Sequence, residues 1–288
     1  MTATLKLVYE AAKVRLGILI MAFAFAGIAV SPGEGLTAWQ LLIIGTATLV
    51  ASSAAGAFNQ FYERDLDARM TRTSNRPFVT GRFDANGIWL SSIFLALLIS
   101  VVAAALVTNW LAALYLFLGA FTYGVVYTVW LKRRTWLNIV IGGLSGSFAV
   151  LAGAAAMGAT LSPAPVILAI VLFLWTPPHF WSLAFACKKD YAAAAVPMLP
   201  VIANDRVSTL AILAHVLVLV PLSLLPFWYG MGWIYLAGAL AGGAFFIYAS
   251  IRLVLDPAIG PAWRSFAASI VQLGLLIIAA ILDQLILG

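Results

Sequence analysis

The chain has 288 residues, of which 64% are hydrophobic and 9% charged, and its mean hydropathy is +1.06. These proportions exclude a soluble globular domain and predict an all-α, polytopic membrane protein that forms a single domain over residues 1–288. The net charge of +6 does not indicate a nucleic-acid partner, because the basic residues are scattered through short segments between apolar runs.

Nine apolar segments approach or exceed the roughly 20 residues that a helix needs to cross a bilayer. Thr108 and Asn109 alone separate the third segment from the fourth, which predicts a tight hairpin. Basic residues before the first segment favour an uncleaved first helix over a signal peptide. The expected spans are 15–31, 38–62, 87–108, 110–130, 137–158, 164–187, 207–228, 231–250 and 264–286.

The distribution of basic residues predicts the orientation in the membrane. If the N-terminus is cytoplasmic, every lysine and arginine falls in cytoplasmic segments and the opposite loops carry none. Nine spans then place the C-terminus on the opposite side, in a bacterial-type inner membrane. Acidic residues near span ends, including Glu34 and Asp283, are expected at the interface, and Asp283 has no evident partner.

The sequence NQFYERDLDARMTRTSNRP, where the second span ends, is the strongest functional signal. Asn59, Glu63 and Asp67 are spaced four and four, so they share one helix face about 6 Å apart in rise. Stacked carboxylates repel, and a divalent cation relieves that repulsion; carboxylate and amide oxygens suit Mg²⁺. Arg72 and Arg76 follow, with forked donors for phosphate oxygens. The stretch predicts a Mg²⁺–diphosphate site at a membrane surface.

A second polar segment, KKDYAAAAVPMLP, follows the sixth span on the same side of the membrane. Asp190 is expected to join the metal ligands of the first motif, and Lys188 and Lys189 to bind the diphosphate. Two prolines in VPMLP interrupt regular helix, so this part is expected to form an apolar lid. The alternative for Asp190 is an ordinary ion pair with a neighbouring lysine.

These motifs resemble those of the UbiA superfamily of intramembrane prenyltransferases. NxxxExxxD with the following RT and NRP is similar to the first aspartate-rich motif of that superfamily. Together with LKRRTWLNIVIGG, WTPPHFW and DYAAAAVPMLPV, it resembles the protoheme IX farnesyltransferase (heme O synthase) family within it. The resemblance implies a nine-helix bundle that transfers the farnesyl group of farnesyl diphosphate to a vinyl group of heme B. Water then adds, giving heme O and diphosphate.

Carried over residue by residue, the resemblance implies the following site. The catalytic residues, which also bind Mg²⁺, are Asn59, Glu63, Asp67 and Asp190. The diphosphate-binding residues are Arg72, Arg76, Lys132, Arg133, Lys188 and Lys189. Lys13 and Arg15 match a Lys-Pro-Arg of the first helix, with Val14 in place of the proline. Further partners would be a downstream heme-modifying enzyme or oxidase assembly factors.

Four aromatic or imidazole side chains complete the expected site. Tyr123 and Tyr127, at helical spacing in the fourth span, would stabilise an allylic cation with their rings; interfacial tyrosines are the alternative. His179 and His215 are the two histidines, about 15 Å below the inner surface. Ionisable groups inside a membrane favour a function, here contact with heme or ligation of its iron. Hydrogen-bonded packing histidines are the alternative.

Three other functions fit parts of the pattern. A UbiA-type prenyltransferase acting on a quinone precursor or another lipid acceptor would share the metal site, although WTPPHFW and VPMLP favour heme. A transporter would place polar residues along a path at mid-depth, whereas the acids here gather at one face. A non-catalytic heme-handling factor would not need the complete set of acids.

Overall fold

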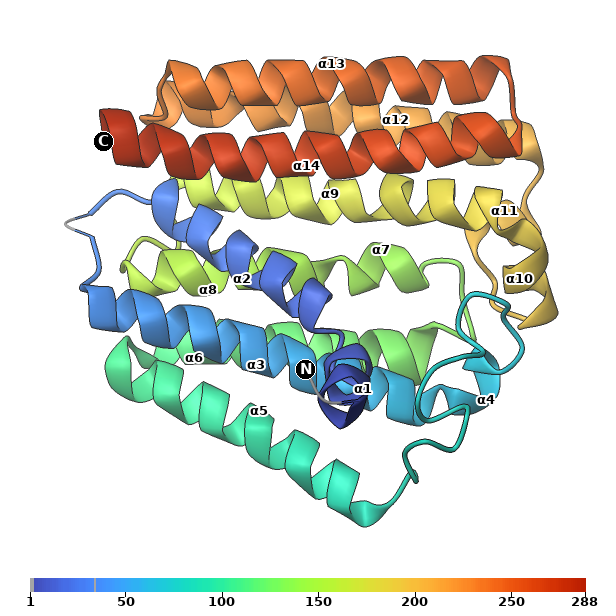
Figure 1. The fold of residues 1–288 in the computed structure, drawn as a ribbon. Helices are drawn as coiled ribbons and strands as arrows, with labels where there is room; N and C mark the ends of the chain where they lie inside the picture. Colours follow the sequence, from blue (N-terminus) through green and yellow to red (C-terminus); the bar gives the residue numbers. More distant parts are fainter. Residues whose placement is uncertain (1–2, 34) are drawn as a thin grey trace.

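A computed structural model describes residues 3–33 and 35–288, so Glu34 lies outside the described residues. The described chain is helical and contains no strand, and long helices run side by side across the molecule (Figure 1). Among the described residues, eight helices are long and apolar enough to cross a membrane, or nine if a first bent pair is one span. The expected all-α bundle is confirmed.

The helices follow the expected spans, with short additional helices between them. In chain order they are α1 (Ala3–Ala11), α2 (Val14–Ala29), α3 (Ala38–Tyr62), α4 (Arg64–Asp67), α5 (Gly87–Val107), α6 (Trp110–Phe121), the π-helix η1 (Thr122–Leu131), α7 (Asn138–Gly142), α8 (Leu144–Ala156), α9 (Pro163–Ala186), α10 (Lys188–Ala193), α11 (Leu199–Ile202), α12 (Asp205–Leu224), the 3₁₀-helix η2 (Leu225–Tyr229), α13 (Trp233–Leu255) and α14 (Ile259–Leu287).

The first expected span, 15–31, corresponds to α2, and an additional short helix precedes it. α1 precedes α2, and the two helices are bent by 51°. The bend lies at Lys13, a residue other than glycine with a left-handed backbone (φ 49°, ψ 43°). Gln60 of α3 donates from Nε2 to the carbonyl of Glu10 at 2.7 Å, which ties the end of α1 to the bundle. We call the α1–α2 bend the elbow.

Polar side chains fix where several helices begin. Asn86, Asn109 and Asn204 accept hydrogen bonds from backbone N–H groups in the first turns of α5, α6 and α12, and so satisfy donors that a helix leaves unpaired. Asn109 also donates to the carbonyl of Ala155 in α8 at 2.7 Å. The expected tight hairpin at Thr108 and Asn109 is therefore confirmed, and it is anchored to a third helix.

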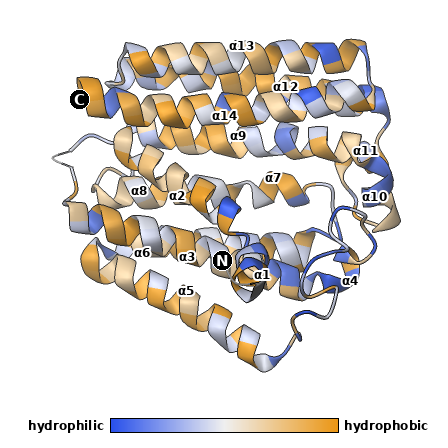
Figure 2. Ribbon diagram, viewed as in Figure 1, coloured by the Kyte–Doolittle hydropathy of each residue, from blue (hydrophilic) through white to orange (hydrophobic). Residues whose placement is uncertain are grey.

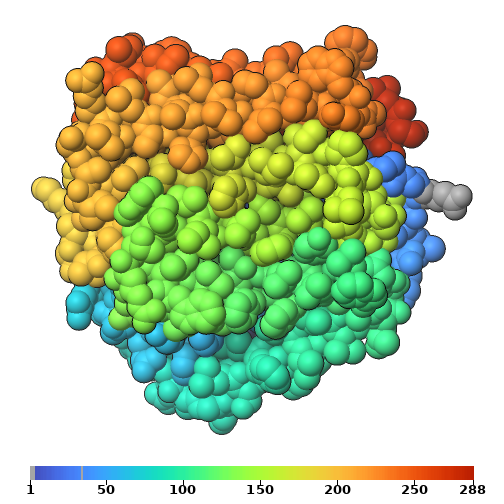
Figure 3. All heavy atoms as spheres, turned by 180° about the vertical axis from the view of Figure 1, so that it is seen from behind, coloured from blue at the N-terminus to red at the C-terminus, as the bar shows by residue number. Residues whose placement is uncertain are grey.

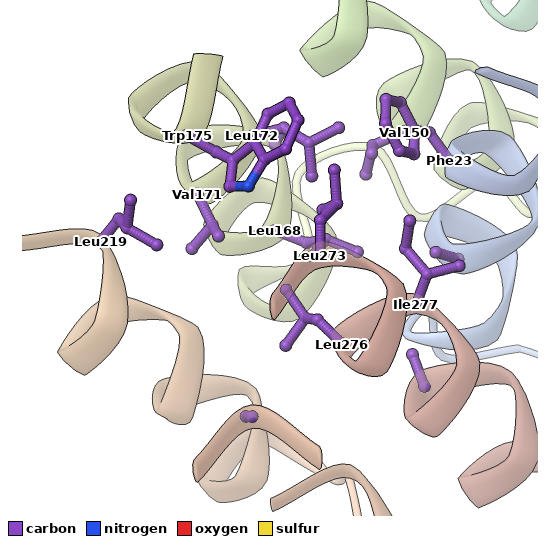
Figure 4. Close-up of a cluster of buried hydrophobic side chains, with 14 of the residues drawn as sticks. Phe23, Val150, Leu168, Val171, Leu172, Trp175, Leu219, Leu273, Leu276 and Ile277 are labelled. Atoms are coloured by element: carbon purple, nitrogen blue, oxygen red, sulfur yellow. The ribbon is translucent and has the colours of Figure 1, made fainter. Parts of the chain in front are cut away.

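The core lies where α2, α8, α9, α12 and α14 meet. In Figure 4, Phe23, Val150, Leu172, Leu273 and Ile277 converge from four of these helices. α2 and α8 cross at Gly27 and Gly153, where an added Cβ would overlap the facing backbone carbonyl; small residues permit such close crossings in membranes. Seen from behind, the bundle is closely packed from the teal α5–α6 side to the orange α12–α13 side (Figure 3).

The polar segments gather at one end of the bundle. α4, α10, α11 and the connection after α4 lie together there, and the C-terminus lies at the opposite end (Figure 1). Hydrophilic residues colour the α4–α10 end blue in Figure 2, whereas the long helices are mostly apolar. The polar ends of α3, η1 and α9 therefore meet beneath the short helices, and this arrangement positions the candidate site.

Candidate active site

The helical path of α3 continues almost unbroken into α4. The N–H of Glu63 bonds the carbonyl of Asn59 at 3.0 Å, and the N–H of Asp67 bonds the carbonyl of Glu63 at 2.8 Å. Residues four apart therefore still lie on one face of the helix across the α3–α4 junction. All three side chains are buried, at 2%, 0% and 1% exposure for Asn59, Glu63 and Asp67.

Each of these three side chains is met by a different cation. Lys132 Nζ lies 2.5 Å from Glu63 Oε2, and Arg76 Nη1 lies 2.6 Å from Asp67 Oδ2. Lys13 Nζ donates to Asn59 Oδ1 at 2.5 Å. Glu63 Oε1 is buried and has no hydrogen-bond partner among the described residues. Buried carboxylates without a balancing charge are costly, and the two cations paired with Glu63 and Asp67 offset that cost.

Asn59 is oriented by the π-helix η1. Its Nδ2 donates to Thr128 Oγ1 at 2.9 Å, and Thr128 in turn donates to the carbonyl of Tyr123, five residues earlier, at 2.8 Å. The amide oxygen of Asn59 is thereby turned toward Lys13. π-helical turns are frequent at functional sites, and η1 was not predicted from the sequence.

η1 also stacks the two tyrosines that were predicted to stabilise a cation. The rings of Tyr123 and Tyr127 lie 5.9 Å apart at an interplanar angle of 21°. Lys13 Nζ is 5.6 Å from the Tyr123 ring centre, and Lys132 Nζ is 5.5 Å from the Tyr127 ring centre. Lys132 Nζ is therefore within cation–π range of the Tyr127 ring, whereas Lys13 Nζ meets Tyr123 at its hydroxyl, 2.9 Å away.

A cavity of about 350 Å³, which we call the central cavity, is lined by Asn59, Asp67 and the two tyrosines, whereas Glu63 is buried beside it and is not among the described lining residues. Its charged and amide lining comes from the ends of α2, α3, α4 and η1 and from the segment after α4: Lys13, Asn59, Asp67, Arg72, Arg76 and Lys132. Away from this end the lining is apolar and comes from α2, α3, α6 and α8, with Ile20, Phe23, Ala51, Leu116, Ala120 and Ala149. One end is suited to a charged head group and the rest to a hydrocarbon chain.

The second polar segment, KKDYAAAAVPMLP, contacts the segment after α4, but its charged residues lie outside the central cavity. Asp190 Oδ1 accepts a hydrogen bond from Thr71 Oγ1 at 3.2 Å, so the two loops touch one residue before Arg72. Lys188 pairs with Asp205 at 2.9 Å, and Lys189 is exposed. Asp190, Lys188 and Lys189 are not among the described residues that line the cavity.

The apolar part of that loop covers the short helix α4. Val196, Met198 and Leu199 are buried in one cluster with Leu66 and Met70. Tyr191, next to Asp190, is buried in the same cluster and lines the cavity. The expected apolar lid over the first motif is therefore present.

Arg133 lies on the surface beside the site. Its guanidinium donates to both carboxylate oxygens of Asp65, at 2.7 and 2.8 Å. These hydrogen bonds hold the pKa of the Asp65 carboxyl below its usual range. Arg133 is not among the described residues that line the central cavity, whereas its neighbour Lys132 is.

The two histidines have different surroundings. His179 lines the central cavity, stacks on Trp175 at 4.2 Å and on Phe266 at 4.6 Å, and bonds Ser269 Oγ through Nδ1 at 2.7 Å. Its Nε2 has no hydrogen-bond partner among the described residues. His215 bonds the carbonyl of Ala211 at 2.9 Å and does not belong to the described lining of the cavity.

The donor set fits a hard divalent cation. No group of three or more His, Cys, Asp or Glu side chains in the described part of the chain is arranged to hold a metal. Mg²⁺ does not require one, because it is usually bound by one or two carboxylates together with substrate phosphates. Glu63 with its unpartnered Oε1, Asp67 and the Asn59 amide oxygen are the side chains that could contribute to such a partial shell.

Lys13 and Tyr191 line the cavity, although neither was among the expected catalytic or binding residues. Lys13 contacts both Asn59 and Tyr123, with Nζ 2.9 Å from the tyrosine hydroxyl. The sequence signal for it was the match of Lys13 and Arg15 to a Lys-Pro-Arg. Tyr191 carried no signal apart from its position beside Asp190.

Comparisons with known proteins give a consistent result. A model of the UbiA prenyltransferase family matches residues 20–275. Protoheme IX farnesyltransferase 2 of Paramagnetospirillum magneticum is 50% identical over 288 residues, covering 100% of both chains. A digeranylgeranylglyceryl phosphate synthase structure is similar with a TM-score of 0.80 at 18% identity, covering 98% of this chain and 99% of that one. A UbiA homolog from Archaeoglobus fulgidus bound to GPP and Mg²⁺ gives a TM-score of 0.72 at 16% identity, covering 98% and 100%.

Proposed function

The chain belongs to the UbiA prenyltransferase family, and on that premise we propose that it is a Mg²⁺-dependent protoheme IX farnesyltransferase. It transfers the farnesyl group of farnesyl diphosphate to a vinyl group of heme B; water adds, and heme O and diphosphate are the products. The identity of half its residues to a protein named protoheme IX farnesyltransferase supports heme as the acceptor. The Mg²⁺ in the related Archaeoglobus fulgidus structure supports the metal.

The observation that carries the proposal is the division of the central cavity. Its charged end joins Asn59 and Asp67 with Arg72, Arg76 and Lys132, and an apolar channel continues from there between α2, α3, α6 and α8. A prenyl diphosphate has the same division between a charged head and a hydrocarbon chain. Burial of the chain among apolar side chains supplies binding free energy, and the cations supply charge-assisted hydrogen bonds to the head.

Asn59, Glu63 and Asp67 would hold the metal. Mg²⁺, when bound, neutralises charge that develops on the leaving diphosphate. Lys132, Arg76 and Lys13 pair with these three side chains, so they are the cations that would lie beside a bound metal and donate to phosphate oxygens. Arg72, with its side chain at the same end of the cavity, adds a forked donor. Asp190, Arg133, Lys188 and Lys189 lie outside the cavity and stay predictions of a contribution from its rim.

The remaining residues control the carbocation. As the C1–O bond of the prenyl diphosphate breaks, the stacked rings of Tyr123 and Tyr127 face the positive charge that develops on the allyl group. The apolar lining and the lid formed by Val196, Met198 and Leu199 exclude water from it. A heme vinyl carbon then forms the new C–C bond, and water captures the resulting cation beside the porphyrin with loss of a proton.

His179 is the residue proposed to contact heme. It lines the cavity with Nδ1 fixed on Ser269, so Nε2 is the nitrogen left for a porphyrin or its iron. His215 lies outside the lining and bonds its own helix, which favours the packing alternative for it.

The long apolar helices lie in the lipid bilayer. We expect the N-terminus in the cytoplasm, the C-terminus on the opposite side of a bacterial-type inner membrane, and product transfer to a heme-modifying or oxidase-assembly partner.

Purified protein with Mg²⁺, heme B and farnesyl diphosphate tests the proposal. Wild type should form heme O and release diphosphate, measured by chromatography and by a phosphate assay. Asp67→Asn should lower the rate by roughly 100-fold or more, because the carboxylate that would hold Mg²⁺ against the leaving diphosphate is lost. The matched control is Asp65→Asn, two residues away on α4 but paired with Arg133 at the surface, which should retain the rate. Transfer to a quinone precursor in place of heme would overturn the acceptor assignment.

A further inference from the structure

A second cavity opens beside the central cavity, between the elbow and the segment 72–77, and we call it the elbow cleft. Its volume is about 540 Å³. Lys13, Leu16, Arg72 and Arg76 line both cavities, so the two spaces adjoin at these side chains. Arg15, Asn75, Gln60 and Glu10 line the cleft alone among the described residues.

The cleft carries an excess of positive charge. Four cations, Lys13, Arg15, Arg72 and Arg76, face it against one carboxylate, Glu10. Arg76 is already paired with Asp67. Arg15 and Arg72, in contrast, have no carboxylate within ion-pair distance anywhere in the described chain. Two forked donors without a partner on one cleft match a carboxylate or phosphate ligand in charge and shape.

The elbow, which carries Arg15, is fixed to α3 and η1 by side-chain hydrogen bonds. Gln60 is 3% exposed, and its Nε2 holds the end of α1 through the carbonyl of Glu10 at 2.7 Å. Lys13 holds the other side of the bend through Asn59 and Tyr123. Gln60 Oε1 is buried and unpartnered among the described residues. A left-handed residue that is fixed from both sides keeps the Arg15 side of the elbow in one place.

The chemistry of the acceptor indicates what the cleft binds. The vinyl groups of protoheme IX lie on one side of the macrocycle and its two propionate carboxylates on the opposite side. If a vinyl group reaches the farnesyl carbon in the central cavity, the carboxylates point away from it. Burial of unpaired carboxylates is costly, so they require cations at a site that is open to water and adjoins the cavity.

We propose that the elbow cleft binds the propionate carboxylates of the porphyrin acceptor, with Arg15 and Arg72 as the paired cations. The inference rests on the proposed function, because it takes the acceptor from there. It sets the orientation of the porphyrin: the carboxylate edge lies at the α1–α2 side and the reactive edge lies toward the stacked tyrosines of η1. Arg15 is then a specificity residue for the acceptor, whereas Arg72 serves both cavities.

The test is a binding titration that requires no turnover. Heme B and its dimethyl ester are titrated by absorbance into purified protein in nanodiscs, without Mg²⁺ or farnesyl diphosphate. Wild type should bind the free acid at least about tenfold more tightly than the ester, as expected for charge-assisted hydrogen bonds. Arg15→Gln should remove most of that preference by weakening the acid alone. Asn75→Asp, which adds a negative charge to the cleft wall, should act in the same direction.

Arg252→Gln, on the exposed end of α13 away from both cavities, is the matched control and should keep the wild-type preference. Equal binding of acid and ester by wild type, or an unchanged preference in Arg15→Gln, would overturn the proposal. So would a result in which Arg15→Gln weakens inhibition by inorganic diphosphate and leaves the acid–ester ratio unaltered, because the cleft would then be a diphosphate site. Heme O formation is measured separately. If the wild type prefers the free acid to the ester but forms no heme O, the proposed function is wrong and the assignment of the cleft is still supported.

Discussion

At the scale of single residues, Glu63 is unusual because its carboxylate is fully buried and only one of its two oxygens is paired. It is fully buried; Lys132 binds one carboxylate oxygen and the other has no partner among the described residues. An unsatisfied buried oxygen costs free energy that folding does not recover. Such a cost is understandable where a ligand later supplies the missing contact, and a metal beside Glu63, Asp67 and Asn59 would do so.

The same pair gives a prediction about stability. Lys132→Met leaves the Glu63 carboxylate buried and unpaired, and should lower the free energy of unfolding by about 3–5 kcal/mol. Thermal unfolding in detergent without Mg²⁺ measures the loss. Lys188→Met is the control, because the Lys188–Asp205 pair has side chains 41% and 51% exposed and should cost no more than about 1 kcal/mol. Adding Glu63→Gln to Lys132→Met should recover part of the loss. Equal losses in the two lysine variants would contradict this account.

Among the site residues, the shared face of the first motif could be predicted from the sequence, whereas the position of Lys13 could not. The shared face of Asn59, Glu63 and Asp67 follows from helical geometry, which is local and continues across the α3–α4 junction. The position of Lys13 depends on a left-handed backbone that is held by partners 46 and 110 residues away. Local propensity disfavours that conformation for a lysine, so no local pattern could have predicted it.

At the scale of elements, the spans were predictable and their irregularities were not. Long apolar runs define α3, α5, α9 and α14 because a bilayer requires them. The π-helix η1 was missed because it needs the same composition as an α-helix and differs only in hydrogen-bond register, as in Lys132 N–H to the carbonyl of Tyr127. Its register is supported by the contact of Thr128 with Asn59, which is tertiary.

Asp283 shows how one element fixes another. It had no evident partner in the sequence, yet it is 4% exposed and its carboxylate, on α14, accepts from the N–H groups of Gly232 and Tyr235 at the start of α13, at 2.5 and 3.0 Å. It therefore caps α13 from a neighbouring helix. A negative charge at a helix N-terminus is favourable, and so is satisfying its free N–H groups.

Asp283→Ala should therefore loosen the packing of the last two long helices. The variant leaves two N–H groups of α13 without their acceptor, and the free energy of unfolding should fall by about 1–3 kcal/mol. Gln284→Ala, one residue further and exposed, removes a side chain of similar size and should have little effect. Thermal unfolding of the two variants in the same detergent decides between them. A loss as small for Asp283→Ala as for Gln284→Ala would mean that the cap contributes nothing.

At the scale of the whole molecule, charge is segregated between the two ends of the bundle. The polar loops around α4 and α10 occupy one end, and the C-terminus lies at the other (Figures 1 and 2). Lysine and arginine in short loops are retained in the cytoplasm during insertion. The end proposed to bind the charged head group is therefore expected to face the cytoplasm, where a soluble diphosphate product can be released.

Cysteine labelling tests this orientation in a chain with one native cysteine. Cys187 is half-buried and burial raises the pKa of its thiol, so it is poorly reactive; Cys187→Ser removes the remaining background. In that background, Leu161→Cys lies between α8 and α9, at a position 90% exposed, and Asp84→Cys lies in the exposed segment before α5. With a membrane-impermeant maleimide on right-side-out vesicles, Leu161→Cys should label at once and Asp84→Cys only after permeabilisation. The reason is that a charged reagent does not cross the bilayer. The reverse pattern would place the charged end outside, and a diphosphate made there could not enter the cytoplasm without a carrier.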